Sequence, residues 1–331
     1  MRQSTSLKTI AALSITVAFL CSSMSIVSAA EFNLRYNAPI ADGGPHGAGM
    51  QAFKQCAEEK SGGRVAIKLF FSGALGAQLD SIEAAQAGTL DIVQIDTPIT
   101  TIDPLLSVFG LPFIFRDRAH VDAVLNGPIG DMVRQRLVAK GVRPLGFWEG
   151  GFRHITNNVR PINTPSDLKG VKMRTPGSKI RIKIFTTYGA NASALPFPEL
   201  YSALQMGVYD GQENPAEVLK TAKFYEVQKY LSLTGHVYTV SYPLISEGVY
   251  QKMPWDLQLA LRQCGDKAGE ATVAFSVDAD KNVVDFAKSQ GMQVNQADVG
   301  AFIAASLPIW GELGKEMGAD AVKLIDIVSS N

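Results

Sequence analysis

Hydrophobic residues after position 30 follow two spacings in turn, one typical of strands and the other typical of helices. Short apolar or alternating runs predict strands, and apolar residues three or four positions apart predict helices. Strands are predicted at 32–37, 65–71, 91–95, 142–148, 171–174, 192–195 and 238–245. Helices are predicted at about 47–60, 79–87, 129–140, 178–188 and 198–205. Because strands alternate with helices over short links, the pattern predicts an α/β fold with a mostly parallel sheet, formed twice.

A much longer helical pattern runs from Trp255 to about Gln290. A helix of that length would extend on the order of 50 Å. The chain has 331 residues, which suggests two domains at about 150 residues each. Neither domain needs a helix so long, so we expect this helix to run across both domains and tie them together.

The first thirty residues differ from the rest of the chain. Arg2 and Lys8 precede an apolar run too short to span a bilayer, and the segment ends in small residues at Ser28 to Ala30. This pattern is typical of a secretory signal peptide cut after Ala30, and it favours that reading over a retained membrane anchor. We therefore expect an exported, soluble protein.

The composition excludes several classes of protein. The chain is 46% hydrophobic with a formal net charge of zero, so it is neither disordered nor a good partner for nucleic acid or anionic membranes. Cys56 and Cys264 lie in helical patterns, where they could be buried thiols or a disulfide, which an exported protein can form. No cysteine or histidine cluster has metal-binding spacing, so no metal is expected. The glycines at 47–52 match a dinucleotide fingerprint in form, but they begin well after the strand ends, and no cofactor is expected.

The segment from 147 to 215 holds the candidate chemistry. Arg153 lies where the second series of strands begins, Arg174 ends a strand, and Asn214 lies in a polar run at 210–215. Ligands of open α/β sheets bind at the carboxyl ends of strands, and two guanidiniums with an amide would suit a carboxylate. Each residue also has a structural interpretation: a surface ion pair for either arginine, and a helix N-cap for Asn214 before Pro215.

Several ordered motifs resemble the solute-binding proteins of TRAP transporters, the DctP-like family. They are KMRTP at 172–176, PFPELYSALQMG at 196–207, DGQENP at 210–215, RHITN at 153–157, EEKSGGR at 58–64, SGALG at 72–76 and FYEVQKY at 224–230. The resemblance covers nearly the whole chain after residue 30.

The resemblance implies a periplasmic binding protein, not an enzyme, with a ligand cleft between two α/β domains and a long helix spanning both. Domain I would comprise 31–150 and about 239–279, and domain II would comprise 151–238 and about 280–331. Such a protein delivers a small organic acid to the membrane permease subunits of an ion-driven transporter. We expect it to act as a monomer.

The same resemblance assigns residues to the site. Arg174 would anchor the carboxylate by two parallel hydrogen bonds, with further contacts from Arg153 and Asn214, while Phe197 would line the pocket and Asp96 would offer a polar contact. Trp148, Glu149 and His46 are added because they flank strand ends.

Three ligand hypotheses remain. A hydroxylated monocarboxylate such as a sugar acid would find hydroxyl acceptors in Glu149 and Asp96. A C4-dicarboxylate or 2-oxoacid would need another cation, for which His46 and Lys172 are the nearest candidates. The remaining hypothesis is an exported enzyme on the same scaffold.

Overall fold

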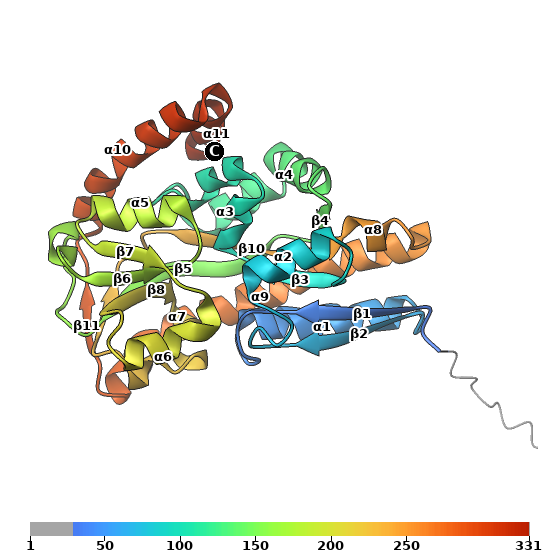
Figure 1. Cartoon of the computed structure of the whole chain (residues 1–331), viewed down its shortest axis with the longest axis horizontal. Helices are drawn as coiled ribbons and strands as arrows, with labels where there is room; N and C mark the ends of the chain where they lie inside the picture. The colour runs from blue at the N-terminus through green and yellow to red at the C-terminus, as the bar shows by residue number, and fades with distance from the viewer. Residues whose placement is uncertain (1–28, 331) are drawn as a thin grey trace, which may run out of the picture.

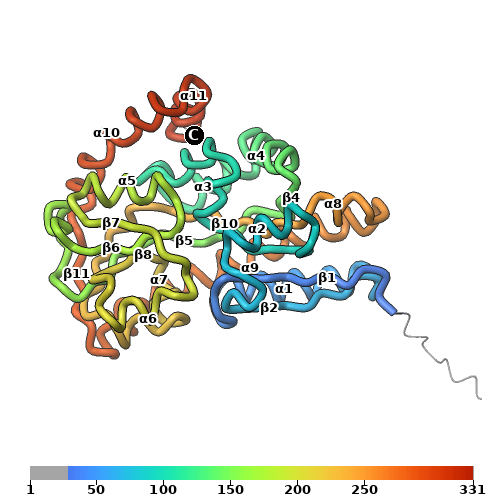
Figure 2. Tube along the Cα trace, viewed as in Figure 1, coloured from blue at the N-terminus to red at the C-terminus, as the bar shows by residue number. Residues whose placement is uncertain are grey.

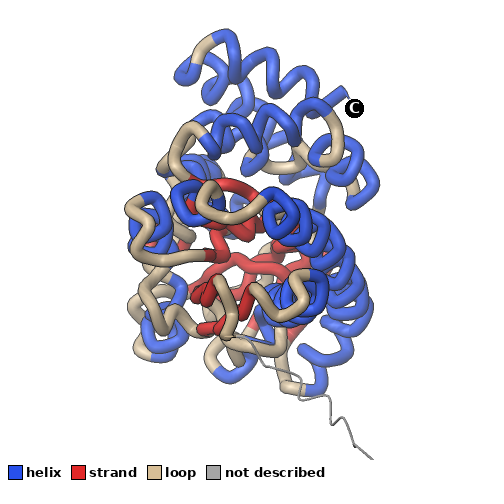
Figure 3. Tube along the Cα trace, turned by 90° about the vertical axis from the view of Figure 1, so that its right-hand side faces the viewer, coloured by secondary structure: helices blue, strands red, loops and turns tan. Residues whose placement is uncertain are grey.

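A computed structural model describes residues 29–330 of the chain (Figure 1). The predicted signal peptide lies almost entirely outside the described residues. Within them, no helix is long and apolar enough to cross a membrane. Figure 3 shows strands at the centre of the molecule with helices around them.

The strands join in one path with the order β2-β1-β3-β10-β5-β8-β6-β7, while β4 pairs with β10 and β9 pairs with both β5 and β11. Their bounds are β1 Phe32–Asn37, β2 Val65–Phe70, β3 Ile92–Ile95, β4 Val142–Pro144, β5 Trp148–Asn157, β6 Lys172–Thr175, β7 Asn191–Ala194, β8 Gly211–Pro215, β9 Tyr230–Leu233, β10 Tyr238–Ser246 and β11 Gln293–Gln296.

The prediction of a mostly parallel sheet is wrong at its centre. Strand β1 pairs in parallel with β2 and β3, and strand β6 pairs in parallel with β7 and β8. The long strands β5 and β10 pair antiparallel with every neighbouring strand in the described residues. They lie in the middle of the molecule (Figure 2), pair with each other antiparallel, and join two parallel α/β units into one mixed sheet.

The helices agree with the predicted ones within a few residues, apart from those that the pattern missed. Their bounds are α1 Pro45–Lys60, α2 Gln78–Gln86, α3 Arg118–Leu125, α4 Pro128–Val138, α5 Lys179–Thr187, α6 Leu200–Gln205, α7 Ala216–Thr221, α8 Glu247–Tyr250, α9 Trp255–Ser289, α10 Val299–Met317 and α11 Ala319–Ser330. We call β1 to β4 with α1 to α4 the first half, and β6 to β9 with α5 to α7 the second half.

The long helix α9 has 35 residues and packs against both halves, as predicted. It contacts α1 of the first half, β5 at the centre, and α7 of the second half. Helix α9 lies very close to the chain before β5, because a Cβ on Gly265 would lie only 2.0 Å from the Leu145 carbonyl oxygen. Glycine at this position therefore lets the helix backbone lie directly on the chain that leads into β5.

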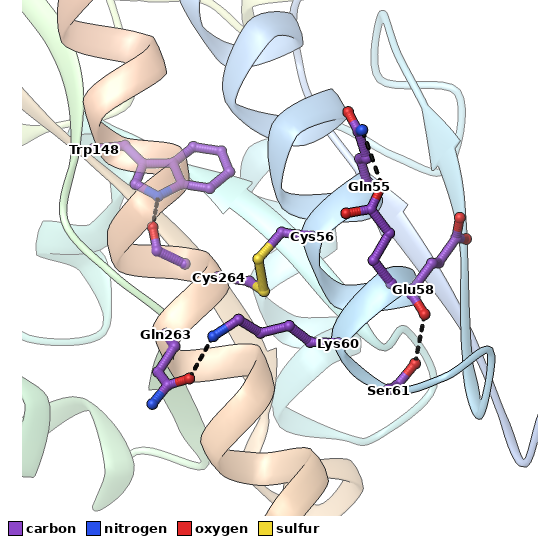
Figure 4. Close-up of a disulfide and its surroundings, with 10 residues drawn as sticks. Gln55, Cys56, Glu58, Lys60, Ser61, Trp148, Gln263 and Cys264 are labelled. Carbon is purple, nitrogen blue, oxygen red and sulfur yellow. Dashed lines mark hydrogen bonds between the residues drawn. A yellow bond between two sulfur atoms is a disulfide. The ribbon is translucent and has the colours of Figure 1, made fainter.

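A disulfide between Cys56 and Cys264 fastens α1 to α9 (Figure 4). The indole of Trp148 lies beside it and donates a hydrogen bond to the Gly265 carbonyl at 2.8 Å. Trp148 is 2% exposed and belongs to the apolar core of the first half. The disulfide, which the sequence left open, thus holds the long helix on the first half.

The carboxyl-terminal helices α10 and α11 form a hairpin that contacts both halves. Helix α10 packs on α5, and α11 packs on a short 3-10 helix at Pro104–Gly110. The Trp310 indole donates to the Pro112 carbonyl at 3.0 Å. His120 Nε2 lies 2.7 Å from the Val328 carbonyl oxygen. The hairpin is therefore a second connection between the halves, separate from α9.

Candidate functional site

Polar side chains from both halves meet at a cavity of about 40 Å³ beside the strand ends. His46, Gln78 and Asp96 come from the first half, and Arg174 and Asn214 come from β6 and β8 of the second. Arg153, on the central strand β5, also lines this cavity. An outer cavity of about 180 Å³ shares Gln78, Arg174 and Phe197 with the inner one. The structure thus brings Arg153, Arg174, Asn214, Phe197, Asp96 and His46 together at one cleft.

Arg153 is already paired within the protein. Its Nε lies 2.5 Å from one Glu213 carboxylate oxygen, and a terminal nitrogen lies 2.9 Å from the other. Arg181 and His236 also contact Glu213, at 3.4 and 3.2 Å. Burial alone would raise the pKa of Glu213, but the two arginines and the histidine hold it well below its usual range. Glu213 is therefore a fixed anion that Arg153 and Arg181 share.

Arg174 has no such partner. Within residues 29–330 no carboxylate forms an ion pair with it, and its Nε donates to the Leu195 carbonyl at 2.8 Å. Its guanidinium carbon lies 5.9 Å from the ring centre of Phe197. Burial lowers the pKa of Arg174 below its ordinary value, yet a guanidinium remains a cation at neutral pH. A buried cation without an anion is costly, so an incoming carboxylate would be strongly favoured here.

Asn214 faces the cleft and does not cap a helix. Its side-chain oxygen accepts from Arg153 at 3.0 Å, and its amide nitrogen donates to the Gln212 side chain at 2.5 Å. Helix α7 begins after Pro215, with no side-chain cap. The N-cap interpretation is wrong because residues 211–215 form a buried strand and not the polar loop that the sequence suggested.

The opposite wall of the cleft carries an ionised acceptor. Asp96 follows β3 and accepts a hydrogen bond from the Ser241 hydroxyl, and His46 Nε2 lies 3.3 Å from its carboxylate. Gln78 accepts from the Asp96 backbone amide at 2.7 Å. Burial would raise the pKa of Asp96, but His46, Ser241 and Arg153 outweigh it, and the pKa lies below its ordinary value. Asp96 can therefore accept hydrogen bonds from a ligand.

Trp148 and Glu149 do not line the cavity, contrary to expectation. Trp148 packs in the core, and Glu149 accepts hydrogen bonds of 2.6 to 2.9 Å from Arg118. The register between β5 and β10 shifts here, and Gly150 is the residue of this stretch that reaches the cavity. A Cβ on Gly150 would lie 2.8 Å from the Thr239 carbonyl oxygen. Only glycine fits where the bulged strand turns toward the cleft.

Lys172, a candidate second cation in the sequence, does not line the cleft. It pairs with Asp210 at 3.6 Å.

Other residues of the cavity wall were not predicted from the sequence. Gln78, Thr239 and Glu217 line the cavity. Glu217 lies three residues beyond Asn214, and this nearness to the DGQENP motif is the one sequence signal that could have identified it. In the described chain no group of three or more histidine, cysteine or acidic side chains could hold a metal ion.

The chain is similar over most of its length to a family of bacterial solute-binding proteins. Residues 37–316 match the sequence model of the DctP family, described as bacterial extracellular solute-binding protein, family 7. A solute-binding protein of Verminephrobacter eiseniae is 37% identical over 302 residues, covering 90% of each chain. The 2,3-diketo-L-gulonate-binding periplasmic protein of Escherichia coli is 33% identical, covering 83% of this chain and 86% of that protein.

The fold is also similar to that of a solved structure. The TRAP periplasmic solute-binding protein from Polaromonas, bound to D-erythronate, superposes with a TM-score of 0.86 at 35% identity, covering 89% of this chain and 98% of that one. Family match, curated relatives and structural similarity all extend over most of the chain. The protein therefore belongs to the DctP family of TRAP transporter solute-binding proteins.

Proposed function

We propose that this protein captures a hydroxylated monocarboxylate, such as a sugar acid, in the periplasm and delivers it to the membrane permease of a TRAP transporter. Acting as a monomer, it would carry the acid without changing it chemically. The observation that supports this most is Arg174, a buried cation beside the cavity that has no carboxylate partner in the described chain.

The charges around the cleft favour a single carboxylate. Arg153 and Arg181 share Glu213, whereas Arg174 lines the cavity with no carboxylate partner among the described residues and supplies a positive charge for a ligand. Asp96 lies on the other wall as an anion with a lowered pKa. A second carboxylate on the ligand would meet Asp96, and His46 is already in contact with that residue. Ligand hydroxyls, in contrast, could donate to Asp96.

Two of the relatives support the same class of ligand. The names of two of them specify 2,3-diketo-L-gulonate and D-erythronate, both of which are acids that combine one carboxylate with several oxygens along a short carbon chain. For this chain we expect an acid of that kind, with its carboxylate on Arg174 and its hydroxyls toward Asp96.

A thermal-shift screen followed by calorimetry tests the proposal. The panel contains C4 to C6 sugar acids, succinate and other C4-dicarboxylates, and 2-oxoacids, because a ligand that binds only the native state raises the melting temperature. We expect at least one sugar acid to bind to wild type and none to bind measurably to Arg174→Ala. Preference for a dicarboxylate would overturn the ligand class, and consumption of the acid would overturn the binding role.

A further inference from the structure

Glu217 is a buried acid in the wall of the cleft whose environment differs from that of every other acid there. It lies on the first turn of α7 and is 4% exposed. It lines the inner cavity and also a second cavity of about 600 Å³ between α7 and α9. One of its carboxyl oxygens, Oε2, is buried without any hydrogen-bond partner in the described structure. Such an oxygen beside a cavity is costly unless a ligand or water meets it.

The charges around Glu217 do not stabilise an anion. The titratable and charged groups that face it or its cavities are Asp42 before α1, His46 on α1, Asp96 after β3, Glu149 and Arg153 on β5, Arg174 on β6, Lys220 on α7, and Asp278, Asp280 and Asp285 on α9. None of these cations forms an ion pair with Glu217 in residues 29–330. Burial, with Asp280 and Glu149, raises the pKa of Glu217 to about 8, although its own backbone amide and Arg153 act in the opposite direction.

We propose that Glu217 is a specificity-determining residue that meets the bound acid as a neutral carboxylic acid and donates its O–H to an oxygen of the ligand. A protonated carboxyl group carries one donor, whereas an ionised one can only accept. The two walls of the cleft are then complementary: Asp96 accepts from ligand hydroxyls, and Glu217 donates to a ligand hydroxyl, keto or carboxylate oxygen. This inference rests on the proposed function. It adds the O–H of Glu217 to the N–H donors that the arginines supply.

Binding should then depend on the proton of Glu217. Once this group ionises, it loses its donor and places a negative charge beside an anionic ligand. Affinity for the acid should therefore be constant near neutral pH and fall as pH rises through about 8, approaching tenfold for each further pH unit. Glutamine at position 217 keeps a donor and cannot ionise, so it should abolish this dependence.

The experiment is calorimetry between pH 6 and 9.5 with the tightest acid from the screen, or with D-erythronate if the screen yields none. Wild type, Glu217→Gln and Glu217→Leu are compared, with Glu270→Gln on the exposed face of α9 as the control for loss of one carboxylate. We expect wild type to lose tenfold or more in affinity from pH 7.5 to 9.5 and Glu217→Gln to stay within threefold. Glu217→Leu should bind at least tenfold more weakly than wild type at pH 7.5 and should change little with pH, and Glu270→Gln should follow wild type.

Each other result overturns the inference. If wild-type affinity does not change with pH, or if the affinity of Glu217→Gln falls in the same way, then the proton that controls binding is not on Glu217. Unchanged affinity in Glu217→Leu would show that it does not contact the ligand. In these cases Arg174-dependent binding would leave the proposed function intact, whereas an absence of binding to any acid at any pH would remove both. Ligand-free melting temperatures establish that each variant is folded.

Discussion

At the scale of single residues, the cleft uses two arginines in two different ways. Arg153 is 5% exposed and held by Glu213, while Arg174 is 2% exposed and has a carbonyl and an aromatic ring as neighbours. The same side chain therefore serves in one place as part of a fixed ion pair and in the other as the charge that a ligand completes. The difference arises from β8, which brings Glu213 to Arg153.

Replacing Arg174 by lysine should weaken binding almost as much as replacing it by alanine. An ammonium cannot form the two parallel hydrogen bonds of a guanidinium, and leaving the ligand carboxylate poorly paired should cost roughly 2–5 kcal/mol. Calorimetry on Arg174→Lys and Arg174→Ala measures this. A dissociation constant for Arg174→Lys within threefold of wild type would contradict bidentate anchoring.

Glu217 should also affect the pH dependence of folding. Its pKa is about 8 in the folded protein and near 4.5 when exposed, so between these values the native state holds a proton that the unfolded state has lost. The free energy of unfolding should therefore fall as pH rises from about 4.5 to 8. Urea denaturation at several pH values should show a shallower fall for Glu217→Gln than for wild type. Parallel curves would mean that Glu217 is not protonated in the folded chain.

At the scale of elements, hydrophobic spacing predicts those strands whose buried side chains are apolar. Strand β1 matches its predicted bounds, and β2 ends one residue early. Strand β8 was missed because its buried residues are polar and satisfy one another: Gln212 donates to the Thr156 hydroxyl at 2.8 Å, and Glu213 binds Arg153. Strand β5 was not recognised beyond Trp148 for the same reason. Arg174 was found because it ends a regular strand, whereas Glu217 follows a strand that periodicity could not identify.

The disulfide between α1 and α9 gives a prediction at this scale. It closes a loop of more than 200 residues, so removing it should lower the free energy of unfolding by about 2–4 kcal/mol, chiefly by freeing the unfolded chain. Urea denaturation of the Cys56→Ser, Cys264→Ser double variant measures the loss. Reductant should destabilise wild type and leave the double variant unchanged, and equal unfolding free energies would contradict this role.

At the scale of the whole molecule, the two halves are joined by the strands β5 and β10, helix α9 and the α10–α11 hairpin, and they also touch directly where α5 meets the 3-10 helix at Pro104–Gly110. The cleft lies between them, with Asp96 on one side and Arg174 on the other. A ligand can touch both walls only when the halves are close together, so binding should favour a closed arrangement through hinge bending.

Small-angle scattering tests this motion. The radius of gyration should decrease when the acid is added to saturation, and it should not change when the same acid is added to Arg174→Ala. A wild-type radius that is the same with and without ligand would mean that the two halves do not close on it.

The hairpin contact of Trp310 has an optical consequence. This indole, on α10, donates to a carbonyl at Pro112 in the first half, while Trp148 is enclosed in the core and Trp255 is 73% exposed at the start of α9. Movement of the halves would thus change the surroundings of Trp310 far more than those of the other two. Intrinsic fluorescence should report closure without any added label, and Trp310→Phe should remove most of the ligand-induced change while leaving the affinity as it was.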